Sequence, residues 1–180
     1  MKYCAETLRL VLKYDPETGR LFWRERHHGM FSCERVANSW NARHSGKPAF
    51  TAKNAYGYHV GSVNGDILQA HRVAWAIASG KDAPDEIDHI NGDRSDNRLS
   101  NLRPVSQSEN RKNMSTPRNN TSGICGVSFD KRLGKWLAKI TVDRKQIHIG
   151  LYASRADAAK ARKKAERQYG FHENHGRAAA

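Results

Sequence analysis

The 180-residue sequence contains no long hydrophobic run, and acidic side chains are scarce beside basic ones. All of its apolar stretches fall well short of the roughly 20 residues that a membrane-spanning helix needs, so we expect no membrane partner. Residues 1–12 are mixed in character and short, which does not match a signal peptide. These absences disfavour membrane and secreted proteins.

Cysteine is also scarce. The three cysteines, Cys4, Cys33 and Cys125, lie far apart and form no CxxC pair, so the usual spacing of a structural zinc site is absent. An odd number of dispersed cysteines is typical of a reducing intracellular setting. The sequence therefore predicts a cytoplasmic protein that is not secreted.

Positive charge is abundant and unevenly placed. The chain has 31 Lys and Arg against 18 Asp and Glu, a formal net charge of +13. Residues 111–167 hold 15 basic and 4 acidic side chains, whereas residues 1–110 hold 15 and 13. Such an excess favours a polyanionic partner, whose phosphates we expect mainly against the C-terminal third. The alternative is a solvated basic surface that only aids solubility.

Local patterns in the first half predict alternating helices and hairpins. Pro16 and Gly19 are typical turn residues, and Asn64-Gly65 is the strongest two-residue hairpin signal. Gly80 is a typical helix end. The predicted elements are a short helix in 2–14, a hairpin over 14–23, a loop-rich insertion over 24–55, a second hairpin over 56–69 and a helix over 70–78.

The second half of the sequence has clearer signals for where helices, strands and linkers begin and end. Ser106 and Glu109 have the spacing of a helix capping box, and the same holds for Ser154 and Asp157. Residues 114–123 consist almost entirely of linker-type residues. The predicted elements are a strand from 87 that runs into a turn, a polar loop over 94–101, a brief strand over 102–105, strands at 124–129, 135–142 and 145–151, and a helix from 154 to 169.

Four polar residues form the candidate catalytic group: Asp88, His89, Asn101 twelve positions after the histidine, and Asn110 nine further on. Cleavage of a phosphodiester needs a base that deprotonates water and a cation that neutralises developing charge. His89 suits the base because its ordinary pKa lies near neutrality. Asp88 and the amide oxygen of Asn110 are hard ligands that suit Mg²⁺, and Asn101 can hold the loop by bonding backbone groups. Asp88-His89 alone is equally compatible with a simple turn.

The spacing of several short motifs is more specific than that pair. The sequences HRVAW (71–75), IDHINGD (87–93), NRLSNLR (97–103) and SEN (108–110) together resemble the HNH endonucleases of phages and of group I intron homing enzymes. The resemblance covers roughly residues 56–114. It implies a ββα-metal, or His-Me finger, fold in which a two-stranded ribbon and a helix grip one divalent ion.

By this resemblance His89 matches the general base and Asp88 the metal-binding acid beside it. Asn101 matches the middle asparagine that braces the loop, and Asn110 matches the last motif position, where histidine is the family's commonest residue. An oxygen donor at that position favours Mg²⁺ or Mn²⁺ over Zn²⁺. His71 is expected to begin a helix and to brace the site or touch phosphate, and it needs no catalytic role.

Residues 124–170 predict a three-stranded antiparallel sheet with one helix against its apolar face. Alternation places Trp136, Ala138 and Ile140 on that face, and we expect Val127 and Phe129 of the first strand and Ile147, Ile149 and Leu151 of the third strand there too. The opposite face is polar and basic, and a sheet of this kind can enter a major groove of duplex DNA. The candidate DNA-binding residues are Ser128, Lys131, Arg132, Lys135, Lys139, Arg144, Lys145, Gln146 and His148.

The motifs GKWLAKI (134–140), IHIGLY (147–152) and ADAA (156–159), with Gly126-Val127, resemble the APETALA/ethylene-response-factor-type DNA-binding domain, which homing endonucleases also carry. The resemblance implies sheet-face contacts at Ser128, Lys139, Gln146 and His148. The arginine-rich first strand of the plant family is absent, so a sequence preference does not transfer. A small protein-binding domain is the alternative.

The sequence thus predicts an α+β protein whose central ββα-metal nuclease domain is followed by a three-stranded antiparallel sheet packed on one helix. The predicted divisions are 1–55 as an N-terminal hairpin and loop-rich extension of the nuclease domain, 56–114 as the nuclease core, 115–123 as a linker, 124–171 as the DNA-binding domain and 172–180 as a disordered tail.

The predicted function is metal-dependent hydrolysis of phosphodiester bonds in duplex DNA by a phage or homing-type HNH endonuclease. It would act in a bacterial or phage-infected cell with one divalent cation, Mg²⁺ or Mn²⁺, and no protein partner is implied. One alternative is a non-catalytic DNA-binding regulator on a decayed nuclease fold. Another is an RNA-binding protein, which the lack of an exposed aromatic run disfavours.

Overall fold

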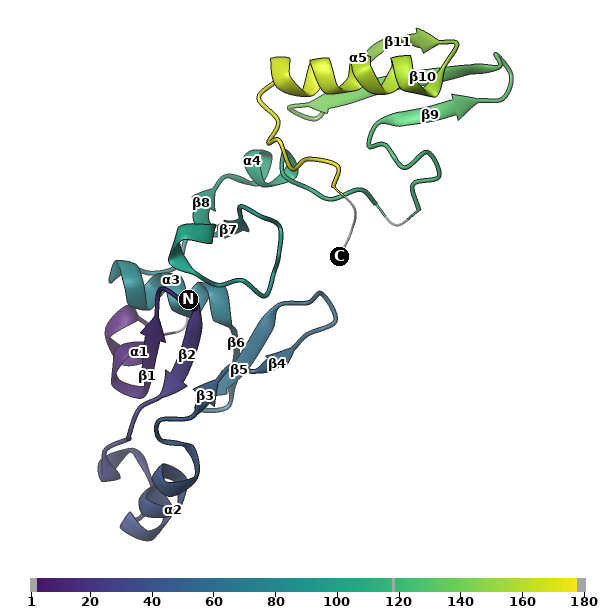
Figure 1. Ribbon diagram of the computed structural model, residues 1–180. Coiled ribbons are helices and arrows are strands. Elements are labelled where there is room, and N and C mark those ends of the chain that lie inside the picture. The colour runs from purple at the N-terminus through teal and green to yellow at the C-terminus, as the bar shows by residue number, and fades with distance from the viewer. Residues whose placement is uncertain (1–2, 118, 178–180) are drawn as a thin grey trace. The chain divides into compact units, whose positions relative to one another are not determined.

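The computed structural model describes residues 3–117 and 119–177, which divide into two compact units. The N-terminal unit extends to Pro104, and the C-terminal unit begins at Val105. Both units mix helices with small antiparallel sheets, which confirms the mixed α and β class predicted from the sequence (Figure 1). Among the described residues, no helix is both long and apolar enough to cross a membrane.

The N-terminal unit contains three small sheets, with strand orders β1-β2-β3, β4-β5-β6 and β7-β8. Its helices, 3₁₀ turns and strands are α1 (Ala5–Val11), β1 (Leu12–Asp15), β2 (Arg20–Trp23), η1 (His28–Met30), α2 (Glu34–His44), β3 (Pro48–Ala49), β4 (Ala52–Lys53), β5 (His59–Val63), β6 (Asp66–Gln69), α3 (Ala70–Ser79), β7 (Glu86–His89), η2 (Leu99–Asn101) and β8 (Leu102–Val105).

The core of this unit forms where α1 packs against α3 and the first two sheets. Leu8, Leu12, Val63 and Val73 are all less than 2% exposed. Burying side chains of this size stabilises a fold by about 1.5–3 kcal/mol each. Helix α3 ends at Gly80, whose φ of +70° gives the left-handed cap that the sequence predicts. The core therefore fixes α3 and, beyond it, the start of β7.

The insertion over residues 24–55, predicted to be loop-rich, instead contains the 11-residue helix α2. The sequence does not predict this helix, because the middle of α2 contains Asn and Ser, which are weak helix formers. Tertiary packing overrides that preference. Ala37 is fully buried, and the Trp40 ring packs edge-on against Trp23 of β2 at a centroid distance of 5.6 Å.

The C-terminal unit has a sheet of order β11-β10-β9 with one long helix against it, as the sequence predicts. Val127, Ala138 and Ala158 form the core between the sheet and that helix. Both capping serines act as expected: Ser106 forms the full capping box with Glu109, and Ser154 accepts a hydrogen bond from the backbone of Asp157. The elements are α4 (Gln107–Arg111), β9 (Val127–Asp130), β10 (Lys135–Val142), β11 (Lys145–Tyr152) and α5 (Arg155–Gln168).

A β-bulge changes the predicted faces of β11. The register shifts between Ala138 and Lys139, so Lys139 lies opposite His148 while Leu137 lies opposite Leu151. The extra residue reverses the alternation, because a bulge places two residues of one strand opposite one of its partner. Leu151 is consequently 41% exposed and does not share the core face predicted for it, and Phe129 of β9 is also half-exposed at 49%.

The last part of the chain differs from the disordered tail that the sequence predicts for 172–180. His175 is only 5% exposed, and the backbone amides of His172 and Gly176 donate to the carbonyls of Lys112 and Met114. Residues 178–180 lie outside the described part of the chain. Because this segment pairs with residues 112–116, the contacts divide the chain inside β8 and not at the linker predicted for 115–123.

Candidate active site

Three of the four candidate catalytic residues lie around one turn of the N-terminal unit. Asp88 and His89 are the last residues of β7, and Asn101 ends the 3₁₀ turn η2 just before β8. All three residues are buried: Asp88 is 7% exposed, His89 is 4% exposed and Asn101 is 6% exposed. Buried polar groups need hydrogen-bond partners, and the partners of these three define the geometry of the loop between β7 and β8.

Asn101 closes that loop through both ends of its amide group. Its Oδ1 accepts a hydrogen bond from the backbone nitrogen of Asn91 at 2.9 Å, and its Nδ2 donates to the backbone oxygen of Asp96 at 2.8 Å. Its own carbonyl accepts from the amide of Ile90 at 2.9 Å. The Asn101 side chain therefore links Asn91 and Asp96, two residues at different positions along the loop.

His89 is oriented by Asn97, a residue whose role does not follow from the sequence pattern. Its Nε2 lies 3.2 Å from Oδ1 of Asn97, which is itself buried. Because that oxygen can only accept, Nε2 carries the proton and Nδ1 is the basic nitrogen. The ring also packs against Tyr58 and His71, at centroid distances of 5.9 and 5.1 Å.

The protonation of His89 is governed mainly by its burial. Burial lowers the pKa of His89, and the hydrogen bond with Asn97 and the nearby carboxylates, Asp88 first among them, oppose this only in part. The imidazole is therefore neutral near pH 7. A neutral imidazole with a fixed tautomer can accept a proton, which is the chemical requirement for a general base.

Asp88 is held by an arginine from the neighbouring strand. Its Oδ2 accepts hydrogen bonds from Nε and Nη2 of Arg103 at 3.1 and 2.8 Å. Within the described residues, no group of three His, Cys, Asp or Glu side chains is arranged to hold a metal ion. Mg²⁺ and Mn²⁺ sites commonly use only one or two protein oxygen ligands and keep several waters, so a carboxylate with an amide oxygen fits such an ion. Asn110 lies on α4 of the C-terminal unit, and its convergence on Asp88 stays a prediction.

The N-terminal hairpin contacts the loop between β7 and β8. The hydroxyl of Tyr14 donates to the backbone oxygen of Asn97 at 2.8 Å. Gly19, at φ +71°, sits so close that a Cβ there would lie 2.5 Å from the backbone nitrogen of Arg98. Contacts between segments so distant along the chain leave no local pattern, so they could not be predicted from the sequence.

Removing the Tyr14 hydroxyl is expected to lower the free energy of unfolding of the N-terminal unit by about 1 kcal/mol, because the buried carbonyl of Asn97 loses its donor. Urea unfolding of Tyr14→Phe measures this in a Trp136→Phe background, where the remaining three tryptophans all report on the N-terminal unit. Tyr56→Phe is the matched control, since Tyr56 is 73% exposed. Equal losses in the two variants would contradict the expectation.

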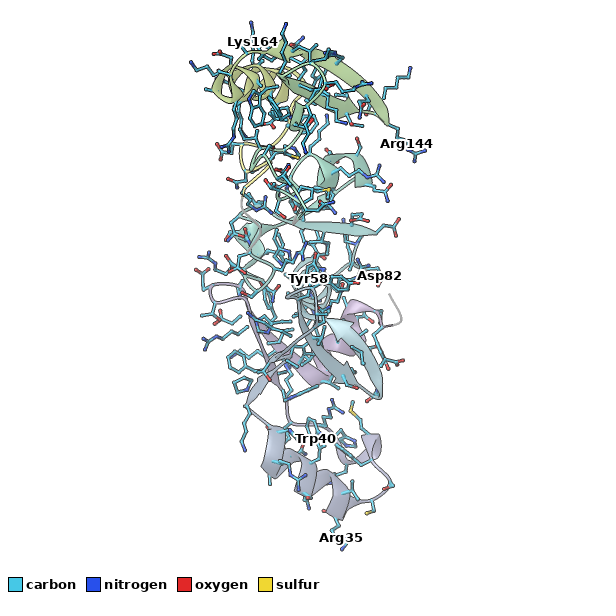
Figure 2. All side chains as sticks on the ribbon, turned by 90° about the vertical axis from the view of Figure 1, so that its right-hand side faces the viewer. Arg35, Trp40, Tyr58, Asp82, Arg144 and Lys164 are labelled. Atoms are coloured by element: carbon cyan, nitrogen blue, oxygen red, sulfur yellow. The ribbon has the colours of Figure 1, made fainter. Side chains whose placement is uncertain are left out.

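The candidate DNA-binding residues of the C-terminal unit lie on the sheet face opposite α5 and along its turns. Lys139 faces His148 across β10 and β11, and Thr141 faces Gln146. Figure 2 shows Arg144 projecting from the turn between these strands. Of the nine candidates, eight are exposed, and Lys139 is half-buried. Leu137 lies on this face, as the alternation along β10 predicts, and Leu151, which was predicted on the apolar face, lies opposite it.

Comparisons with known proteins identify the family of the segment that contains this loop. Residues 68–112, which contain α3, β7, β8 and α4, match the family model described as HNH endonuclease. Over 60 residues the chain is 43% identical to Protein 3.8 of Escherichia phage T7, a stretch that makes up 33% of this chain and 50% of that protein. The chain thus matches about half the length of this curated relative. No solved structure matches the chain.

The chain therefore carries an HNH endonuclease domain at residues 68–112, as its motifs predict. The family model is described as that of an endonuclease, and HNH nucleases generally use a divalent metal ion. The family match ends at residue 112, before the first strand of the C-terminal sheet. The resemblance of residues 124–170 to a plant-type DNA-binding domain accordingly stays a prediction.

Proposed function

We propose that this chain is a metal-dependent endonuclease that hydrolyses phosphodiester bonds in duplex DNA, of the phage or homing type. The observation that carries the proposal is the buried His89, held in one tautomer by Asn97 and placed next to Asp88 inside the HNH domain. A buried, neutral histidine beside a carboxylate has the protonation state that activation of water requires. The similarity to a phage protein supports action inside a bacterial or phage-infected cell.

In the proposed mechanism, Nδ1 of His89 removes a proton from the water that attacks phosphorus. Asp88 and Asn110 would hold one divalent ion, Mg²⁺ or Mn²⁺, and Arg103 fixes the carboxylate of Asp88 in its orientation. A bound divalent ion neutralises charge on the phosphate and on the leaving oxygen. The bond between phosphorus and the 3′ oxygen breaks, that oxygen takes a proton from water, and the products carry 5′-phosphate and 3′-hydroxyl ends. In this proposal β7, β8 and α4 form the ββα-metal arrangement.

Asn97 and Asn101 are positioning residues in this scheme. Asn97 keeps the basic nitrogen of His89 toward the water, and Asn101 keeps the ends of the loop together. Both side chains are buried, so their geometry does not depend on solvent. Rigid placement of the reacting groups contributes directly to rate, because misplacement by about 1 Å can slow a reaction about 100-fold.

The C-terminal unit is proposed to bind duplex DNA as an APETALA/ethylene-response-factor-type domain. Its exposed sheet face would lie in the major groove, with Gln146, His148 and Ser128 at base edges. Basic side chains at the sheet edges and turns would contact phosphates: Lys131, Arg132, Lys135, Lys139, Arg144 and Lys145. The local excess of basic residues supports this proposal, since phosphate contacts release counterions and dominate affinity.

Plasmid cleavage tests the proposed function. Supercoiled plasmid is incubated with the full-length protein and Mg²⁺ or Mn²⁺, with and without a chelator, and the ends are mapped. We expect cleavage that needs the ion, stops on chelation and leaves 5′-phosphates. A non-catalytic DNA-binding regulator would instead bind in a salt-sensitive manner and give no metal-dependent product. Equal background nicking by the wild type and by His89→Ala under every metal would contradict the nuclease assignment.

A further inference from the structure

The exposed face of α2 carries four polar side chains and one alanine at helical spacing. Arg35, Asn38, Ser39, Ala42 and Arg43 are all exposed, and their spacing of three, four, seven and eight positions places them on one stripe. The acidic residue of the helix, Glu34, lies at the edge of that stripe. The opposite face contains Ala37 and Trp40, which pack inward.

The helix is firmly anchored although weak helix formers stand at its middle. The guanidinium carbon of Arg26 lies 4.1 Å from the ring centroid of Trp40 and 5.0 Å from that of Trp23, so its cation contacts both indoles. Asn41 accepts from the backbone nitrogen of Arg26 at 3.0 Å and donates to its oxygen at 2.9 Å. Figure 2 shows Trp40 between the helix and the rest of the unit and Arg35 at the outer end of the helix.

The four polar side chains of this stripe are exposed. None of the four polar side chains forms a hydrogen bond or ion pair with another residue in the described part of the chain. Each Asn or Ser in a helix costs roughly 0.5 kcal/mol relative to alanine. Asn41 offsets that cost by bonding Arg26, whereas Asn38 and Ser39 gain no internal contact. Asn38 and Ser39 are therefore available for contacts with a partner outside the chain.

The chemistry of the stripe selects that partner. Arg26 is buried, and the other charged side chains of residues 24–47 are four exposed Arg or Lys against two exposed Glu, so the surface is complementary to a polyanion. Arg35 and Arg43 lie about 12 Å apart along the helix axis, with Asn38 and Ser39 between them. Asn pairs with adenine edges, Ser bonds to bases of either kind, and Arg contacts guanine or phosphate. The major groove of B-DNA admits one helix, and the small side chain of Ala42 leaves room for close approach to a base or a thymine methyl group.

We propose that α2 enters the major groove of duplex DNA and contacts base edges through Asn38 and Ser39. Arg35 and Arg43, near the two ends of the stripe, contact phosphates. The proposal deepens the proposed function on which it rests, because duplex DNA is the substrate implied by the HNH domain. It gives the N-terminal unit its own means of reading sequence, independent of the C-terminal sheet. The insertion thereby becomes a determinant of target choice.

Selection of bound sequences from a random duplex library tests this with the full-length protein. Asn38→Ala/Ser39→Ala is expected to lose preference at a few adjacent base pairs, a change of about 5- to 150-fold in discrimination. Binding to unrelated duplexes should change less than about twofold. Alanine favours the helix at these exposed positions, so the variant keeps its fold, which far-UV circular dichroism verifies.

Arg35→Ala/Arg43→Ala is expected to lower the salt dependence of binding, log K against log [salt], by about two in slope. Lys13→Ala/Lys81→Ala removes the same charge from exposed positions of the same unit and should leave the slope and the selected sequence unchanged. An unaltered base preference in the Asn38/Ser39 variant, or an unaltered slope in the arginine variant, would each overturn the proposal. Absence of metal-dependent cleavage by the wild type would sink the nuclease function instead, since neither binding readout depends on catalysis.

Discussion

Replacing His89 by alanine is expected to slow metal-dependent plasmid nicking by about 10²- to 10⁴-fold. The expectation follows from the tautomer. Asn97 accepts the hydrogen bond of Nε2, so Nδ1 is left as the basic atom, and alanine has nothing that accepts a proton in its place. Water would then attack without a base, and the residual rate would come from the metal ion and from substrate binding alone.

A buried histidine can also serve only to pack the fold, so the measurement must separate the two roles. Loss of a base that acts on bound water lowers the rate at saturating DNA and leaves DNA binding unchanged. Loss of a packing residue lowers stability and DNA binding together. We therefore expect the dissociation constant for duplex DNA to change less than about threefold in His89→Ala, while the rate constant falls by the amount given above.

His28→Ala is the matched control, because it removes an imidazole from an exposed position of the same unit. Its nicking rate should equal that of the wild type. A His89→Ala protein that nicks within a few-fold of the wild-type rate, with its fold intact by thermal unfolding, would show that another group deprotonates the water. In that event the role given to Asn97 would fail with it.

The elements that the sequence predicted correctly are those that neighbouring residues determine. The capping box of Ser106 and Glu109 involves groups three positions apart, and the cap at Gly80 needs only one glycine that accepts a positive φ. The hairpin turn at Asn64-Gly65 likewise has φ of +50° and +88° at the two residues that the pattern marks. The family motif around Asp88 and His89 is equally local, and the HNH match confirms the domain that it predicts.

The features that the sequence did not predict depend on partners that are distant along the chain. Helix α2 forms because Trp40 and Asn41 meet Trp23 and Arg26, and no periodicity within residues 24–55 marks those contacts. The support of Asn97 by Tyr14 spans 83 positions. The bulge after Ala138 is a property of the strand pair, so alternation along β11 alone cannot place Leu151. Asn97 begins the motif NRLSNLR (97–103), but its role depends on the orientation of the His89 ring, which a local motif does not determine.

Lowering the pH from 7 to 4.5 is expected to destabilise the N-terminal unit by about 3 kcal/mol through His71 alone. His71 lies in the first turn of α3, is 5% exposed, and its Nδ1 is buried without a hydrogen-bond partner in the described part of the chain. Burial first, then the neighbouring His89 and Arg72, lowers the pKa of His71 to about 3. A protonated ring there would be a cation with an unsatisfied donor.

The sign follows from which state binds the proton. In the unfolded chain His71 has its ordinary pKa of about 6.5, so below that pH the unfolded state takes up a proton that the folded state refuses. The contribution of His71 is therefore complete above about pH 6.5 and declines by about 1.4 kcal/mol per pH unit as the pH falls toward 3. Any folded pKa well below 4.5 gives the same loss at pH 4.5, so the magnitude does not depend on the lower limit.

His71→Phe keeps a ring beside Tyr58 and cannot be protonated, so the stability that this variant loses between pH 7 and pH 4.5 should be smaller than the wild-type loss by about 3 kcal/mol. Urea unfolding in the Trp136→Phe background gives both values, and His28→Gln should reproduce the wild-type difference. His89, whose pKa burial also lowers, remains in every protein compared and accounts for part of the acid sensitivity that His71→Phe retains. Were His71→Phe to lose as much stability on acidification as the wild type, His71 would already be charged in the folded state, which its buried Nδ1 does not allow.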